Sequence, residues 1–148
     1  MSMKRLSYQA NIKASPDRVY DSMLGLNDKK TYEQWTIAFN MSSTWEGDWS
    51  KGSKIMFVGV TEKGQREGMI ARIVENIPHK FVSILHYGIL ENGVEITDGP
   101  KVEGWANATE NYTFEKTADG TTMVLHTTVF YTWHQTQPSR WLSYRVRQ

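Results

Sequence analysis

The sequence contains no cysteine. Disulfide bonds, thiolate catalysis and cysteine-ligated metal sites are therefore excluded. Its first residues are too polar for a signal peptide, and no apolar run is long enough to cross a membrane. These absences predict a cytoplasmic protein that does not associate with membranes.

An excess of charge of one sign is also missing, because the formal net charge is only +1. Such a chain has no strong field to attract nucleic acid or an anionic membrane, and we expect neither partner. The sequence lacks a glycine-rich phosphate loop, a G-x-S-x-G nucleophile turn and a dinucleotide fingerprint. His79, His126 and His134 do not have metal-ligand spacing, so we predict no metal and no cofactor.

Aromatic residues, by contrast, are abundant. They make up 12% of the 148 residues, with six Trp, seven Tyr and five Phe. This length fits a single domain that is large enough to form a hydrophobic core. In a domain of this size, so many rings must either pack in the core or line a pocket.

The order of hydrophobic patterns predicts an α+β domain. A first strand over 4–14 is followed by a helix over 15–24, with Ser15 as its cap and Pro16 at its first position. A second short helix is expected over 27–39. After these helices, the hydrophobic pattern changes from the period of a helix to the period of two that is typical of strands. Short turns join these strands, which predicts antiparallel pairing. These strands are expected at 54–60, 68–77, 80–90, 102–116 and 121–131.

Several stretches resemble the START-like helix-grip (SRPBCC) superfamily, and most of all its small bacterial members similar to the activator of the heat-shock chaperone ATPase. They are "ASPDRVYDSML", "YEQWTIAF", "WEGDWSKGSKIMF", "GMIARIVENIP" and "GWANATENYTFEKTADGTTM", and the resemblance covers roughly 5–128. It implies one domain over 1–148. In that fold a curved antiparallel sheet of six or seven strands, with two short helices after strand one, grips a long C-terminal helix around a cavity.

The end of the chain departs from this pattern. Residues 129–148 are aromatic, short and interrupted by Pro138, which predicts an atypical, shortened C-terminal helix. A short helix would leave part of the apolar concave face of the sheet uncovered, and monomers rarely expose such patches. A homodimer, in which a second chain covers this face, is therefore one hypothesis.

The resemblance places "WEGDWSKGSKIMF" on the second strand, a turn at 48–52 and the third strand. Trp45 and Trp49 would then lie at the mouth of the sheet, beside Trp35 of the second helix. Strand alternation supplies the other inward positions. Together these give a predicted ligand-binding set, for which ordinary core packing is the alternative. Its members are Trp35, Phe39, Trp45, Trp49, Phe57, Met69, Ala71, Trp105, Tyr112, Phe114, Met123 and Leu125.

Two residues are weak catalytic candidates. His86 lies among apolar neighbours and could act as a general acid or base, although an outward or hydrogen-bonded structural histidine is the favoured interpretation. Glu110 shares strand parity with Tyr112. A carboxylate in an apolar cavity would have a raised pKa and could be catalytic. A solvated position near the sheet edge is favoured for it instead.

Three functions remain open. The first is binding of a small hydrophobic or aromatic molecule, such as a lipid, in the cavity. The second is a polyketide-cyclase-like enzyme that uses Glu110 and His86 as acid–base residues. The third is a cofactor of a chaperone ATPase. The lack of a catalytic motif favours binding over catalysis.

Overall fold

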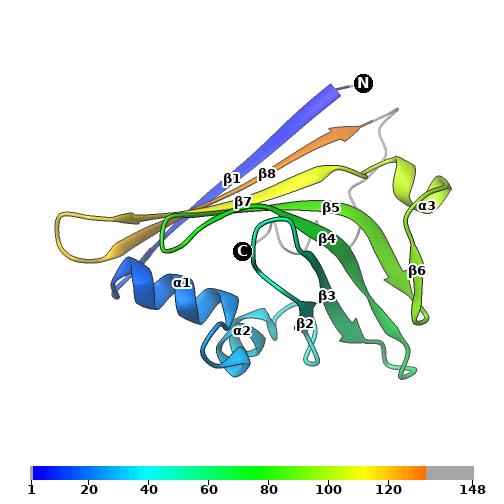
Figure 1. The fold of residues 1–148 in the computed structure, drawn as a ribbon, viewed down its shortest axis with the longest axis horizontal. Coiled ribbons are helices and arrows are strands. Elements are labelled where there is room, and N and C mark those ends of the chain that lie inside the picture. Colours follow the sequence, from blue (N-terminus) through cyan, green and yellow to red (C-terminus); the bar gives the residue numbers. More distant parts are fainter. Residues whose placement is uncertain (1, 133–148) are drawn as a thin grey trace.

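A computed structural model describes residues 2–132 of the chain, and Figure 1 shows a curved antiparallel sheet with short helices. Seven strands form one continuous path, as the sequence predicts. In spatial order they are β1 (Ser2–Ile12), β8 (Thr122–Thr132), β7 (Ala108–Lys116), β5 (Phe81–Glu91), β4 (Arg66–Ile77), β3 (Lys54–Val60) and β2 (Thr44–Gly47).

An eighth strand, β6 (Val94–Ile96), pairs with the end of β5 and adds to this predicted set. The turn between them contains Asn92 and Gly93, both with positive φ, which is the backbone conformation that an Asn-Gly hairpin turn requires. The predicted C-terminal helix lies outside the described residues.

Two helices follow β1 at the predicted places. Helix α1 (Pro16–Leu24) begins with a proline, whose fixed φ suits the first helical position, and ends at Gly25 in the left-handed conformation. Ser15 is its cap residue but its side chain makes no capping hydrogen bond. Helix α2 (Lys29–Thr36) is shorter than predicted and begins where the Asp28 side chain accepts a hydrogen bond from the Lys30 amide.

The prediction of a strand from residue 102 is wrong at its start. Residues Pro100–Glu103 form a short helix, α3, and β7 begins only at Ala108. Gly99 has φ of 86° and Pro100 occupies the first helical turn, so this local pair starts a helical turn where the apolar pattern suggested a strand.

Helices α1 and α2 lie along the concave face of the sheet, and α3 lies at its other end (Figure 1). The larger core cluster lies between helices α1 and α2 and the sheet. In it, Tyr20, Leu24 and Tyr32 of the helices pack against inward residues of the strands. A second cluster around Met69, Trp105 and Phe130 lies beside α3. No helix among residues 2–132 is long and apolar enough to span a membrane.

Candidate functional site

A cavity of about 690 Å³ lies between the two helices and one half of the concave face. The sheet forms one wall of this cavity. Inward residues on β1, β7 and β8 are neighbours in register, and strand alternation puts them on the same face. Its apolar and aromatic lining consists of Tyr8, Ala10, Ile12, Ala14, Val19, Met23, Trp35, Phe39, Tyr112 and Val124. The volume is in the range of ordinary small-molecule sites, about 300–1,000 Å³.

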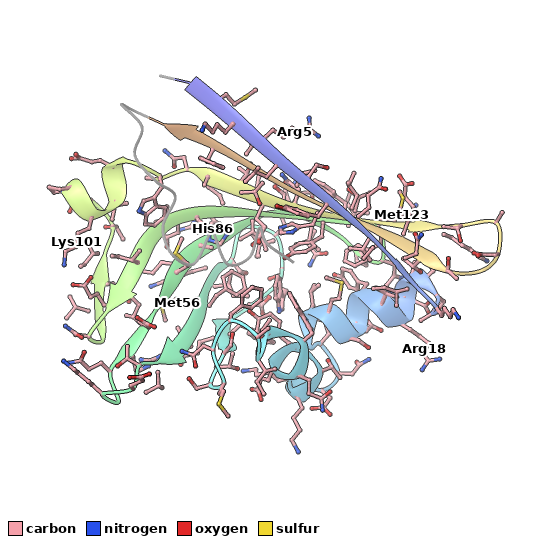
Figure 2. The ribbon with its side chains drawn as sticks, turned by 180° about the vertical axis from the view of Figure 1, so that it is seen from behind. Arg5, Arg18, Met56, His86, Lys101 and Met123 are labelled. Atoms are coloured by element: carbon pink, nitrogen blue, oxygen red, sulfur yellow. The ribbon has the colours of Figure 1, made fainter. Side chains whose placement is uncertain are left out.

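A smaller set of polar residues joins this lining. They are Gln9, Arg18, Ser22, Thr31, Gln34 and His126. Arg18 is exposed and projects outward from α1 (Figure 2), so its charge lies at the rim of the cavity. His126 is different, since only 9% of its surface is exposed and it belongs to the sheet wall.

Behind His126, four polar side chains form a cluster in the sheet wall. Glu110 has no exposed surface, and each of its oxygens meets an imidazole. Its Oε1 lies 3.3 Å from Nε2 of His86, and its Oε2 lies 3.0 Å from Nε2 of His126. The Tyr112 hydroxyl donates to Oε2 at 3.3 Å. A buried carboxylate needs such donors, because it has lost its hydration.

The rings of Tyr112 and His126 are stacked. These two residues are direct partners in the β7–β8 register, with ring centroids 4.4 Å apart and planes within 2° of parallel. The stack and the contact with Glu110 together fix the imidazole of His126 at the cavity wall. Such cross-strand ring pairs also stabilise the sheet itself.

His86 completes the cluster on the side away from the cavity. It has no exposed surface, lies in the middle of the molecule (Figure 2), and contacts the Phe57 ring. Its Nδ1 is buried and has no hydrogen-bond partner among the described residues. Within residues 2–132, no group of His, Asp or Glu side chains has an arrangement that could hold a metal ion.

The structure therefore corrects one expectation, because Glu110 is not solvated at the sheet edge but fully buried. Of the two alternatives favoured for His86, outward or hydrogen-bonded, the structure shows the second, with an inward ring in contact with Glu110. Both residues follow the alternation of β5 and β7, in which Ile84 pairs with Glu110 and Val82 pairs with Tyr112. The expectation that Glu110 lies near the sheet edge is wrong because β7 lies inside the sheet, between β5 and β8.

The four candidate tryptophans do not form one wall. Trp35 lines the cavity, and its Nε1 donates to the Met23 carbonyl at 2.9 Å. Trp105 is in the separate cluster beside α3, where its Nε1 donates to the Lys101 carbonyl. Trp45 and Trp49 contact each other edge-on, with centroids 6.0 Å apart.

Trp45 and Trp49 border a second hollow, of about 420 Å³, beside the turn between β2 and β3. The Lys29 ammonium lies 4.1 Å above the Trp45 ring, which is the geometry of a cation–π contact. Tyr20 also borders this hollow, and its hydroxyl donates to Oδ1 of Asn76 at 2.6 Å. Burial raises the pKa of the Tyr20 phenol, so at neutral pH it is a neutral donor.

Among the remaining predicted residues, Phe39 and Tyr112 line the cavity. Phe57, Ala71 and Phe114 are buried in the larger core cluster, and Met69 is buried in the smaller one. Met123 and Leu125, which we expected to face inward, have the opposite parity on β8 from the cavity residues Val124 and His126. Their predicted inward orientation is wrong.

No family model matches the sequence, and no curated protein matches it either. Solved structures match nearly the whole chain. The Aha1 dimer from Colwellia psychrerythraea is 22% identical, with a TM-score of 0.56 over 97% of this chain and 86% of that one. A major latex-like protein from Panax ginseng is 12% identical, with a TM-score of 0.62 over 97% and 90%. A protein from Rhizobium loti is 14% identical, with a TM-score of 0.65 over 99% and 91%.

The chain has the START-like fold. At these identities the likeness fixes the architecture and not the ligand. The chemistry of the site depends instead on the inward polar residues of this chain, above all the cluster around Glu110.

Sequence reasoning missed His126 and Val124 in the START-like cavity wall. In "TTMVLHT" one face carries Met and Leu and the other carries Val and His, so hydropathy favoured the wrong face. The signal that identifies the right face is register. Tyr112 and Phe114 pair with His126 and Val124, so the predicted inward face of β7 already determines that of β8.

Proposed function

We propose that the protein binds a small hydrophobic or aromatic molecule in the cavity between the sheet and helices α1 and α2. The observation that carries this proposal is the cavity of about 690 Å³ with ten apolar or aromatic residues in its wall. An apolar pocket with a few polar groups is the usual form of a small-molecule site. The START-like fold supports the same function.

A cavity-filling variant tests this proposal. Ala10 and its neighbour Asn11 are both exposed on β1, but Ala10 belongs to the cavity wall and Asn11 does not. Ala10→Trp places an indole in the cavity, whereas Asn11→Trp adds the same group outside it. N-phenyl-1-naphthylamine, an apolar dye that fluoresces when it leaves water, is the probe.

We expect the wild-type protein and Asn11→Trp to bind the dye with similar affinity. Ala10→Trp should weaken binding by about tenfold or more, because the indole occupies volume that the dye needs. Equal binding by all three proteins would place the dye elsewhere and contradict the proposal. Circular dichroism of each variant checks that the fold is retained.

Acid–base catalysis of the polyketide-cyclase kind is the second candidate, and the His126–Glu110 pair favours it. A carboxylate that orients an imidazole at a cavity wall is an arrangement that general-base enzymes use. Here the group that could touch a substrate is His126, since Glu110 and His86 are both fully buried. Turnover on a panel of polyketide-like substrates that survives His126→Phe and Glu110→Gln would contradict this role.

A single domain over 1–148, a homodimer and a cytoplasmic location stay predictions. Size-exclusion chromatography with light scattering measures the second of these directly. The chaperone-cofactor hypothesis has no specific contact in its favour among residues 2–132, and stimulation of a chaperone ATPase by the purified protein is its test.

A further inference from the structure

We infer that the cavity selects ligands that carry a hydroxyl group, whose O–H donates a hydrogen bond to Nδ1 of His126. This inference rests on the proposed binding function and adds a chemical class to it. The ligand is then an apolar or aromatic molecule with an alcohol or phenol group.

The position of His126 supports this inference. The residue belongs to the cavity wall, while its Nε2 faces away from the cavity toward Oε2 of Glu110 at 3.0 Å. The parallel stack on Tyr112 fixes the plane of the ring. With Nε2 used and the ring held on one face, Nδ1 is the polar atom that this histidine can offer to a ligand.

The contacts of Glu110 indicate where the protons of the cluster lie. Nε2 of His86, Nε2 of His126 and the Tyr112 hydroxyl all meet the oxygens of Glu110. An ionised carboxylate accepts from all three at once, whereas a protonated one must donate to one of them. The contacts therefore favour a carboxylate that receives a proton donor from each neighbour.

The tautomer of His126 follows from this pattern. When Nε2 carries the proton that Glu110 accepts, a neutral imidazole has an unprotonated Nδ1, which is a hydrogen-bond acceptor. The wall of the cavity then presents an acceptor rather than a donor.

His86 is a second proton donor to the same carboxylate. Its Nδ1 is buried without a hydrogen-bond partner among the described residues. A protonated ring would bury an N–H group that has no acceptor, which costs more than a buried lone pair. His86 is therefore neutral and donates through Nε2 to Oε1 of Glu110. It acts as a positioning residue for the carboxylate.

Ligand chemistry follows from an acceptor in an apolar wall. A hydroxyl group satisfies Nδ1, while a ketone or ether brings only lone pairs and leaves this nitrogen without a partner. An ammonium group could donate, but it would lose its hydration among Val124, Trp35 and Phe39. A neutral hydroxyl on an apolar body is the group that fits both conditions.

The test compares 2-naphthol with 2-methoxynaphthalene, which have the same ring system and differ in the O–H donor. Binding is followed by isothermal titration calorimetry or by quenching of tryptophan fluorescence. The wild-type protein should bind 2-naphthol about three- to tenfold more tightly, the effect of one net hydrogen bond. In His126→Phe, which keeps an aromatic ring beside Tyr112, the ratio of the two dissociation constants should fall to about one.

His79→Asn is the matched control. It removes an imidazole from the turn between β4 and β5, where φ of 67° suits asparagine, and it should keep the wild-type ratio. Equal affinity for both compounds in the wild-type protein would overturn this inference and leave the proposed function standing. Failure to bind either compound would contradict the proposed function itself.

A measurement without mutation covers the case in which His126→Phe does not fold. In ¹⁵N-histidine NMR of the wild-type protein, Nδ1 of His126 should resonate as an unprotonated nitrogen and shift when 2-naphthol is added. 2-Methoxynaphthalene should leave it nearly unchanged. A protonated Nδ1 in the free protein would overturn the inference.

Discussion

The two halves of the concave face differ in how completely side chains fill the space above them. On β3, β4 and β5, the inward residues Ile55, Phe57 and Ile84 are fully buried in the larger core cluster. On β1, β7 and β8, the inward residues Tyr8, Ala10, Val124 and His126 line a cavity. We call the first the packed half and the second, which borders the cavity, the hollow half.

Aromatic packing explains part of this difference. Tyr32 of α2 and Trp49 both lie against Phe57, with ring centroids 6.4 and 5.6 Å away, and they fill the space over β3. Over β1 the cavity wall carries Ala10, and Ala14 follows the end of the strand, so two small side chains lie where large rings would fill the space. The distribution of large and small side chains thus decides where the cavity forms.

Truncation in the packed half should have the largest effect. Phe57→Ala removes a fully buried ring and should lower the free energy of unfolding by about 3–5 kcal/mol. Tyr8→Ala in the hollow half removes a ring that is 36% exposed, and its cost should stay below about 1 kcal/mol. Urea denaturation of both variants measures the two values, and similar losses would contradict the division into halves.

The buried cluster is the exception within the hollow half. Glu110→Ala removes the acceptor of two imidazoles and the Tyr112 hydroxyl in a buried site. The free energy of unfolding should therefore fall by about 2–4 kcal/mol. Glu115→Ala, on the exposed end of the same strand, should change stability by less than about 0.5 kcal/mol. An equally mild effect at Glu110 would show that the cluster does not hold the wall together.

A smaller effect is expected at Tyr20 of α1. Tyr20→Phe removes the hydrogen bond to Asn76 and should cost about 1 kcal/mol at pH 8. Because the pKa of Tyr20 is raised above 10.0 in the folded state, its neutral form stabilises the fold below pH 10, and this contribution is lost at higher pH. Between pH 8 and pH 10.5, the free energy of unfolding should fall less for Tyr20→Phe than for the wild type, and denaturation at the two pH values measures this.

The smallest effect is expected in the turn between β7 and β8. Hydrogen bonds from Thr117 and Thr121 lower the pKa of Asp119 to about 2. Its ionised form stabilises the turn above pH 4, and this contribution is lost as the pH falls from about 4 to 2. Asp119→Asn should slightly reduce stability at pH 7. Its stability should also fall less than that of the wild type as the pH is lowered from about 4 to 2, while dye binding stays unchanged. A marked loss of binding would link the turn to the cavity and weaken the separation of roles.

Most of the fold could be predicted from the sequence because local signals and alternation agree. Ser15-Pro16 begins a helix, "KIMFVGV" forms β3, and the segment over 45–57 forms β2, a turn and β3 as expected. The exception was residues 100–103, where the Gly-Pro pair outweighed the apolar pattern. Strand β6 was missed because three residues give too short a pattern for alternation to reveal.

The candidate site was predicted less well, because it depends on which face of each strand is inward. For β8 both faces carry apolar residues, and the choice of Met123 and Leu125 over Val124 and His126 followed hydropathy alone. The tryptophans were grouped by residue type, whereas Trp35 and Trp49 share the larger core cluster around Tyr32 and Trp105 lies in the smaller one. Residue type predicts that the rings are buried, whereas strand register decides whether they line a cavity or fill the core.

We expect the hollow half to bind a small apolar molecule and the packed half to bind none. Amide chemical shifts in ¹⁵N NMR, recorded as N-phenyl-1-naphthylamine is added, test it most directly. We expect the changes to cluster at Ala10, Tyr112, Val124 and His126, and to be small at Ile55 and Ile84. Changes centred on Trp45 and Trp49, or no saturable change at all, would contradict the claim.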